Sequence, residues 1–243
     1  AGEEHLGALR RMTEYLFPPP DVASLPVIGT DARYPVRRIF CVGRNYAEHA
    51  KEMGSEIDRA APFYFTKSAM HLAGQGLPVN YAPGTRDYHH EVELVVALGQ
   101  EAHNVPAGQS LQAVFGYAVG LDMTRRDLQA ASKEKRQPWD TAKDVEQSAV
   151  VGAITPGGSF DPNGPHRISL TVNGEPRQVG LLSDMVWRVD EIIAQLSALY
   201  HLEAGDLIFT GTPAGVGAVL PGDRLRGEVA GLAPVETVIG PAD

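Results

Sequence analysis

The stretch DYHHEVELVVALG at residues 87–99 begins with polar side chains and ends in a continuous apolar run. Its β-branched residues and its closing glycine predict a strand rather than a helix. Successive side chains of a strand point to opposite faces, so Glu91 and Glu93 share one face while Val92 and Leu94 share the other. We therefore expect two carboxylates to converge on one spot beside an apolar run.

Two acids in such a place are costly, because each charged oxygen loses water and repels its neighbour. A hard divalent cation compensates both costs, and carboxylate oxygens suit Mg²⁺, Mn²⁺ or Ca²⁺. Glu91 and Glu93 are therefore candidate metal ligands. For this strand alone, a solvated face with two ordinary surface charges is the commoner explanation. His89 shares that face, which leaves a mixed histidine and carboxylate site for a transition metal as a minor alternative.

The composition is that of an ordinary globular protein, with 43% hydrophobic and 21% charged residues. No apolar stretch approaches the roughly 18 residues that a membrane span needs. The formal net charge of −9 disfavours nucleic acids and anionic membranes as partners, although local positive clusters can still hold a small anionic substrate. A single cysteine, Cys41, excludes an internal disulfide framework, and no secretion signal is recognisable, so we expect a cytoplasmic protein.

The chain is expected to divide into an N-terminal arm or cap at residues 1–35 and a catalytic, β-rich domain at residues 36–243. A short helical pattern between residues 6 and 16 precedes three prolines at 18–20, which begin an extended connector. In the second part strands outnumber helices. There an Asn-Gly pair at residues 173–174, flanked by apolar runs, predicts a β-hairpin.

A possible catalytic base lies early in this second part. Residues 45–54 have helical composition and end in a glycine, directly after a strand expected at 37–42. In a helix, His49 and Glu52 lie three apart on one face, so the carboxylate can hold the imidazole and leave one ring nitrogen free as a base. A solvated histidine on an exposed turn is the more ordinary explanation. This short helix lies between two glycines, and the residues that follow it up to 61 are polar and turn-like. Because such a segment buries little apolar surface, we also expect residues 44–61 to order over bound substrate as a lid.

A third acid and two polar side chains follow the central strand. An apolar strand at residues 113–122 ends in Asp122, and a T-x-x-D pattern beginning at Thr124 predicts the start of a helix. Arg126 and Gln129 fall three apart on the first turns of that helix, so a cation and an amide can face whatever the acids bind. An exposed helix rich in Lys and Arg explains them equally well.

Common cofactor motifs are absent from the sequence. Residues 215–220 lack the third glycine of the dinucleotide fingerprint, and no glycine loop leads into a Lys-Ser or Lys-Thr pair as a P-loop does. One cysteine and scattered histidines give no structural zinc spacing.

Lys143 lies in a loop expected at residues 138–143, where a surface charge is its ordinary explanation.

Taken together, four motifs resemble the fumarylacetoacetate hydrolase family over roughly residues 37–240. They are VGRNYAEH at 42–49, EVE at 91–93, GLDMTRRDLQ at 120–129 and FTGTPAGVG at 209–217. Within this family the chain is most similar to the fumarylpyruvate and maleylpyruvate hydrolases. That similarity rests on HHE at 89–91, TRRD at 124–127 and DVEQSA at 144–149.

The resemblance implies an α+β, mostly β fold, a mixed β-roll or barrel with few helices, and a homodimer. It also implies Mg²⁺ or Mn²⁺ held by three carboxylates, a His-Glu base pair and a catalytic lysine. The expected metal ligands are Glu91, Glu93 and Asp122; the catalytic residues are His49, Glu52 and Lys143; and the residues expected to bind substrate are Arg126, Gln129 and Thr212. One departure is Ser68, where many members of the family have proline after the lysine.

The reaction implied is hydrolytic carbon–carbon cleavage of an acylpyruvate, such as fumarylpyruvate or maleylpyruvate, in the catabolism of aromatic compounds through a gentisate-type pathway. Its products are pyruvate and a dicarboxylate. His49 is expected to take a proton from the attacking water, and Arg126 to pair with the far carboxylate of the substrate. Two alternatives stay open: decarboxylation of a 2-oxo diacid such as oxaloacetate, and a non-catalytic protein that binds an oxo acid.

Overall fold

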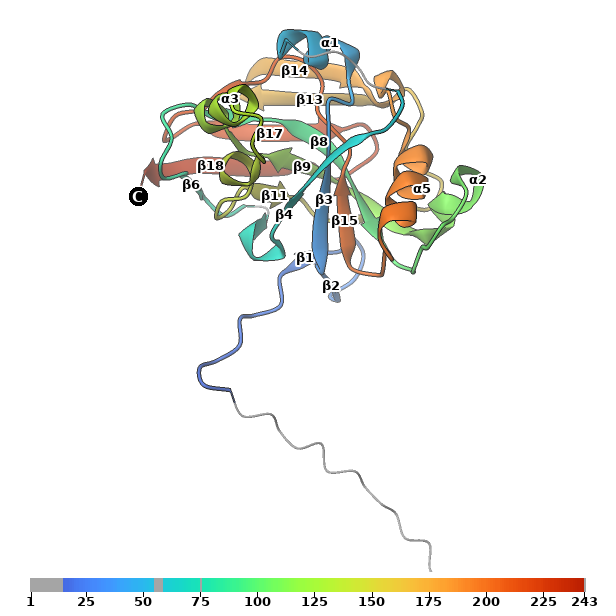
Figure 1. Cartoon of the computed structure of the whole chain (residues 1–243). Coiled ribbons are helices and arrows are strands. Elements are labelled where there is room, and N and C mark those ends of the chain that lie inside the picture. The colour runs from blue at the N-terminus through green and yellow to red at the C-terminus, as the bar shows by residue number, and fades with distance from the viewer. Residues whose placement is uncertain (1–14, 55–58, 75, 243) are drawn as a thin grey trace, which may run out of the picture.

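A computed structural model describes residues 15–54, 59–74 and 76–242 (Figure 1). Most of their regular structure is strand, which confirms the mixed β-roll with few helices that the sequence predicts. The helix expected between residues 6 and 16 lies almost wholly outside the described residues. In the described part, no helix is both long and apolar enough to cross a membrane.

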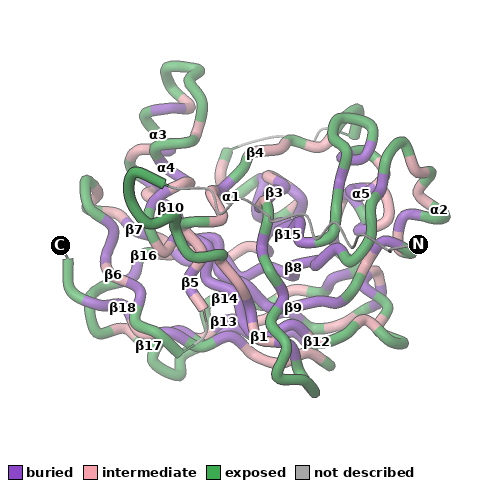
Figure 2. The backbone as a smooth tube through the Cα atoms, turned by 90° about the horizontal axis from the view of Figure 1, so that it is seen from below, coloured by how far each residue is buried: buried purple, intermediate pink, exposed green. Residues whose placement is uncertain are grey.

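The largest sheet has eight strands and mixes parallel with antiparallel pairs. Its centre is β8, which pairs antiparallel with β9 on one side and β15 on the other. The path runs β4 (Phe63–Lys67), β3 (Arg38–Gly43), β15 (Asp206–Phe209), β8 (Val92–Leu98), β9 (Val114–Asp122), β11 (Ala149–Val151) and β5 (Leu72–Gly74), with β12 (Thr155–Pro156) also on β9. All seven residues of β8 are buried, so both faces of the sheet are covered there (Figure 2).

Three smaller sheets surround this one. The five-stranded sheet has the order β14 (Glu175–Leu181), β13 (Arg167–Val172), β17 (Arg224–Val229), β18 (Val235–Ala242) and β6 (Val79–Tyr81). The others are β10 (Thr124–Arg125) with β7 (Tyr88–His90) and β16 (Gly217–Ala218), and the pair β1 (Ser24–Pro26) with β2 (Arg33–Pro35). The hairpin expected at the Asn-Gly pair is confirmed: β13 and β14 meet at Asn173 and Gly174, whose φ angles of 54° and 85° suit a tight turn.

Helices occupy the ends and the outside of the roll (Figure 1). Among the described residues they are α1 (Ala47–Glu52), α2 (Ala107–Ser110), α3 (Arg126–Glu134), α4 (Asp140–Lys143) and α5 (Val189–Leu199), with short 3₁₀ turns at Ala69–His71, Leu111–Ala113 and Leu182–Asp184. α5 buries Ile192, Ile193 and Leu196 on a single face, as its apolar spacing predicts. The loop expected at residues 138–143 is wrong, because its end forms the single turn of α4.

The two faces of the large sheet build two separate hydrophobic clusters. On one face Leu94 of β8 packs in a cluster with Leu170 of the five-stranded sheet. On the other, Val95 shares a cluster with Leu25 of β1 and with Tyr34 of β2. The Tyr34 hydroxyl also donates to the Leu98 carbonyl at 2.7 Å. Part of the expected N-terminal arm is therefore anchored to the body of the roll.

The continuous strand expected at residues 87–99 is wrong. β7 ends at His90 and β8 begins at Val92, which leaves Glu91 between two strands of different sheets. The helix start expected at Thr124 is also wrong, because Thr124 pairs with His89 in the small sheet and its hydroxyl donates to the Asp122 carbonyl at 3.1 Å. The helix begins two residues later. Pairing with a distant strand thus overrode a local capping pattern.

Candidate active site

Three buried carboxylates form the centre of the site. Glu91 lies between β7 and β8, Glu93 on β8, and Asp122 at the end of β9. One oxygen from each lies within 4.8 Å of the others, and the three residues are at most 4% exposed. The strand pairing explains the convergence: Glu93 faces Gly120 across the two strands, and the Asp122 N–H donates to the Glu91 carbonyl at 2.8 Å. The structure therefore brings together the three metal ligands that the resemblance implies.

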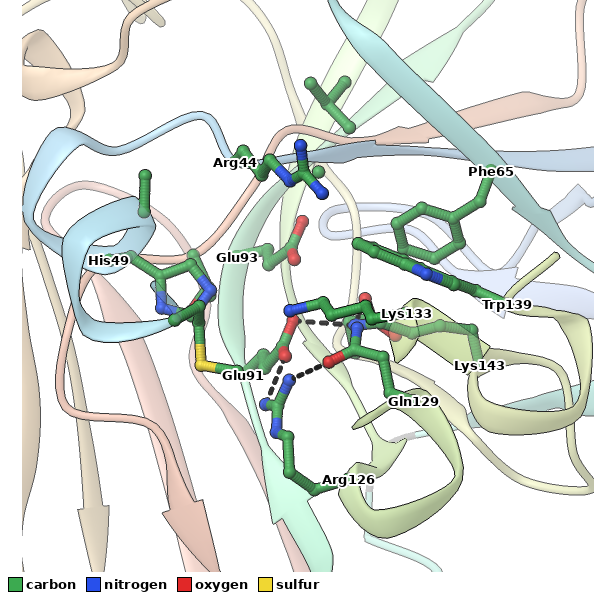
Figure 3. A pocket seen from close by; sticks show the side chains of 16 residues that line it. Arg44, His49, Phe65, Glu91, Glu93, Arg126, Gln129, Lys133, Trp139 and Lys143 are labelled. Carbon is green, nitrogen blue, oxygen red and sulfur yellow. Dashed lines mark hydrogen bonds and ion pairs between the residues drawn. The ribbon is translucent and has the colours of Figure 1, made fainter. Parts of the chain in front are cut away.

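Three cations reach this cluster from other elements, and two of them, Lys143 and Arg126, are labelled in Figure 3. Lys143 Nζ donates to Glu91 Oε2 at 2.8 Å and to Asp122 Oδ2 at 2.6 Å. Arg126 Nη2 donates to Glu91 Oε1 at 2.5 Å. Lys67 Nζ lies 2.9 Å from Asp122 Oδ1 and is fully buried. Glu91 and Asp122 are thus each held by two cations, and pairing of Arg126 with a far carboxylate of a substrate stays a prediction.

The pKa values of Glu91 and Glu93 are shifted in opposite directions. Burial alone would raise the pKa of Glu91, but the charges of Lys143, Arg126 and His49 outweigh it and hold that pKa well below its usual range. Burial, followed by repulsion from Asp122 and Glu91, raises the pKa of Glu93 well above its usual range. One acid of the three is therefore expected to carry a proton unless a further cation enters.

The donor set fits a divalent metal. Three convergent carboxylates offer the oxygen ligands that Mg²⁺ and Mn²⁺ prefer. A dication would also relieve the repulsion between the acids that contributes to the raised pKa of Glu93. Glu93 is held in place by the Gly211 N–H, which donates to its Oε2 at 2.6 Å. Gly211 has a φ of 102°, and a Cβ there would lie 2.6 Å from Asn45 Cβ, so this turn requires glycine.

The histidine and glutamate expected as a base pair do lie together. His49 Nδ1 is 3.1 Å from Glu52 Oε2, and both oxygens of Glu52 accept from the Gly215 N–H at 3.2 Å. His49 is only 7% exposed and lines the cleft that holds the acids. With Nδ1 against the carboxylate, Nε2 is the nitrogen left free for proton transfer. Tyr46 and Ala50 beside it are buried as well, which is more apolar burial than we expected for a lid, and part of the expected lid, residues 55–58, lies outside the described residues.

The remaining expected residues line the same cleft, which is narrow, with a cavity volume of about 30 Å³. Gln129 accepts from Arg126 Nη1 at 2.7 Å through its Oε1. The Thr212 hydroxyl donates to the Val92 carbonyl at 2.8 Å and accepts from Gln178 Nε2 at 2.7 Å. Every residue predicted for the site therefore lies at the cleft or in contact with a residue that does.

Some residues of the site escaped the sequence analysis. Arg44 and Lys133 line the cleft, packed against Trp139 (Figure 3). Lys133 follows Arg126 and Gln129 at helical spacing, so extending that helix face by one turn would have found it. Arg44 falls inside the first family motif but carries no local signal of a role.

A half-buried hydrogen bond accommodates the departure from the family at Ser68. The Ser68 N–H donates to Asp144 Oδ1 at 2.8 Å, and His71 Nδ1 lies 2.6 Å from the same oxygen. Proline has no N–H to donate. Asp144 directly follows Lys143, whose carbonyl accepts from Lys67 Nζ. This contact therefore links the two segments that carry the lysines of the site.

Comparisons with known proteins agree with this geometry. A family model described as the C-terminal region of fumarylacetoacetate (FAA) hydrolase matches residues 38–240. A fumarylpyruvate hydrolase of a Ralstonia species is 46% identical over 194 residues, which cover 79% of this chain and 100% of that protein. A mitochondrial oxaloacetate tautomerase of Rattus norvegicus is 43% identical over 196 residues, covering 81% of this chain and 88% of that protein.

A solved structure adds to this likeness. The crystal structure of fumarylpyruvate hydrolase from Pseudomonas aeruginosa, in complex with Mn²⁺ and pyruvate, superposes with a TM-score of 0.89 at 43% identity. The match covers 93% of this chain and 99% of that one. Both the family model and relatives above 40% identity span most of the residues that build the roll and its acidic cluster. The chain belongs to the fumarylacetoacetate hydrolase family.

Proposed function

We propose that this protein is a metal-dependent hydrolase that cleaves a carbon–carbon bond of an acylpyruvate, such as fumarylpyruvate, to give pyruvate and a dicarboxylate. The observation that carries the proposal is one cleft in which three buried carboxylates meet a histidine held by a glutamate. The Ralstonia hydrolase, at 46% identity, supports the same reaction.

Glu91, Glu93 and Asp122 would hold Mg²⁺ or Mn²⁺, which when bound supplies Lewis-acid stabilisation of negative charge developing on the pyruvate half of the substrate. Lys143 lies between two of these acids and adds a fixed positive charge there. Gln129 offers an amide to a substrate oxygen on the same side of the cleft. Together these groups orient the 2-oxo acid end of the substrate.

His49 would act as the base for water. Its Nε2 takes a proton from a water molecule, whose oxygen bonds to the keto carbon remote from the pyruvate carboxylate. The carbon–carbon bond then breaks, its electron pair passes to the pyruvate half, and a proton on that carbon completes pyruvate. Glu52 keeps the imidazole oriented and stabilises its charged form through the 3.1 Å contact. Arg126 and Thr212 would bind substrate oxygens along the walls of the cleft.

A second candidate is chemistry on a 2-oxo diacid such as oxaloacetate, either decarboxylation or tautomerisation. The relationship to the rat oxaloacetate tautomerase favours it. Neither reaction needs an attacking water. Assays of fumarylpyruvate and oxaloacetate with His49→Ala separate the candidates: loss of acylpyruvate cleavage with oxaloacetate turnover retained assigns His49 to water activation.

The direct test is a panel of acylpyruvates assayed with Mn²⁺ or Mg²⁺. Release of pyruvate from fumarylpyruvate or maleylpyruvate is expected, and the panel also reports which double-bond geometry is preferred. Metal-dependent binding of oxalate without turnover of any member of the panel would instead favour a non-catalytic protein that binds oxo acids.

The family resemblance further supports a homodimer. Light scattering coupled to size-exclusion chromatography tests that assembly, with a mass near twice 26.1 kDa expected. We also propose a cytoplasmic location and a role in a gentisate-type pathway for aromatic compounds. Disruption of the gene should then abolish growth on an aromatic acid of that pathway.

A further inference from the structure

Two cations in the cleft stand apart from the acidic cluster. Arg44 lies between β3 and α1, and Lys133 lies in the last turn of α3. Both point into the cleft beside Trp139 (Figure 3). Across the described residues, neither makes an ion pair with a carboxylate, in contrast to Arg126 and Lys143. No carboxylate of the described residues therefore neutralises these two charges.

Aromatic rings hold these cations without neutralising them. The Arg44 guanidinium carbon lies 5.3 Å from the centre of the Phe63 ring and 5.7 Å from that of Trp139. Lys133 Nζ lies 5.3 Å from the Trp139 ring. Such contacts fix the position of a cation but leave its N–H groups available. Arg44 Nε is buried and has no hydrogen-bond partner in the part of the chain that the structure describes, so no protein acceptor uses the guanidinium there.

The backbone at Arg44 is also unusual. Its φ is 60°, a left-handed conformation that residues other than glycine rarely adopt. Strain of this kind persists where surrounding structure enforces it and is concentrated at binding sites. Burial, together with the charges of Arg126 and Arg44, lowers the pKa of Lys133 below its usual value, as expected where several cations crowd one space.

The charge balance indicates what this space accepts. Lys143, Arg126 and Lys67 already pair with Glu91 and Asp122, so the acidic cluster draws on neither of the charges of Arg44 and Lys133. A divalent metal on those acids adds two positive charges, and the two cations beside Trp139 add two more. A ligand with one carboxylate at the metal would leave that second pair unmatched. A substrate with carboxylates at both ends places one negative charge at each of these two positive centres.

We propose that Arg44 and Lys133 form the subsite for the far carboxylate of a dicarboxylic acylpyruvate. The inference rests on the hydrolase function proposed above and names its substrate class. In this arrangement the 2-oxo acid end binds at the three acids, and the terminal carboxylate lies against the cation pair held by Trp139. Arg126, already paired with Glu91, orients the metal end instead.

The test compares a dicarboxylate substrate with a monocarboxylate analogue. The ratio of kcat/KM for fumarylpyruvate to that for acetylpyruvate, which lacks the terminal carboxylate, is measured for the wild type, Arg44→Gln, Lys133→Gln and the double variant. Each single change should lower the ratio about tenfold, the usual loss when one charged hydrogen bond is removed. Lys135→Gln, an exposed neighbour with the same change in charge, should leave the ratio unaltered. An unchanged ratio in the double variant would overturn the subsite.

A binding experiment separates failure of the subsite from failure of the hydrolase function. If the Mn²⁺-loaded wild type cleaves neither acylpyruvate, the hydrolase function fails. The subsite is then judged by calorimetry with fumarate on the wild type and on the double variant. The wild type should bind fumarate at least tenfold more tightly than the double variant does. Equal affinities of the two proteins for fumarate would refute the subsite, while retained oxalate binding in the variant shows an intact metal end.

Discussion

Replacing Lys143 with methionine should destabilise the metal-free protein much more than the Mn²⁺-loaded protein. Lys143 is 2% exposed, and its Nζ lies between Glu91 and Asp122, at 2.8 and 2.6 Å. Burial lowers the pKa of a lysine, but here Asp122 and Glu91 outweigh it and raise that pKa above its usual value. The ammonium is therefore charged and fixed in place, and methionine keeps most of its volume without its charge.

The magnitude follows from the acids left behind. Removing one partner from a buried ion pair typically costs about 3–5 kcal/mol. Glu91 keeps Arg126 and Asp122 keeps Lys67, so this range is the upper bound for the loss of Lys143. For a chain of this size that corresponds to a fall in melting temperature of about 6–20 °C. A dication on Glu91, Glu93 and Asp122 restores the missing charge, so saturating Mn²⁺ should stabilise the variant more than it stabilises the wild type.

Thermal unfolding of wild type and variant, each with EDTA and with Mn²⁺, measures the effect. Lys133→Met is the matched control, since Lys133 is half-buried, pairs with no carboxylate among the described residues and is repelled by Arg126 and Arg44. Its loss should cost less than about 1 kcal/mol. If Lys143→Met melts with the wild type in EDTA, or if Mn²⁺ stabilises both proteins equally, the reasoning about charge compensation is refuted.

Three further predictions concern the metal and the base. Exhaustive EDTA treatment should abolish activity, and Glu91→Ala should lose Mn²⁺ binding and activity together; activity that survives chelation would count decisively against a metal mechanism. Because the pKa of Glu93 is raised, Mn²⁺ should displace a proton and bind more weakly as the pH falls. For the same reason, the metal-free protein should lose stability as the pH rises through that pKa. Calorimetry in buffers of different ionisation enthalpy detects the released proton, and Glu93→Gln should eliminate the proton release. His49→Gln should lower kcat about 100- to 10,000-fold with little change in oxalate affinity, whereas a parallel loss of oxalate binding would assign His49 a structural role instead.

Period-two patterning was enough to predict that Glu91 and Glu93 converge, and it did so although the continuous strand assumed for them is wrong. The alternation places two acids on one side of an extended segment. The two carboxylates still meet, although the strands break at Glu91. The break itself was not predictable locally. It arises because β7 pairs with β10 and β16 while β8 pairs with β9 and β15, and those partners are distant in the sequence.

The contacts of the cations were even less predictable from the local sequence. Lys67 reaches Asp122 from a strand 55 residues earlier, and no local pattern at Lys67 announces that contact. The position of Lys143 was implied only by the family resemblance, since a lone lysine in a polar segment is ordinarily a surface charge. The contact between Arg126 and Gln129 could be predicted, because residues three apart on one helix face are neighbours by their spacing alone.

The arrangement of charge also explains how one acidic cluster can serve both folding and catalysis. Three carboxylates at this burial would oppose folding if all were ionised and unpaired. Lys143, Arg126 and Lys67 compensate Glu91 and Asp122, and the raised pKa of Glu93 lets the third acid remain neutral. The fold can therefore form before the metal binds. Metal entry then displaces one proton from Glu93, whose carboxylate the Gly211 N–H already holds in place, and shares the oxygens of Glu91 and Asp122 with the cations that now contact them.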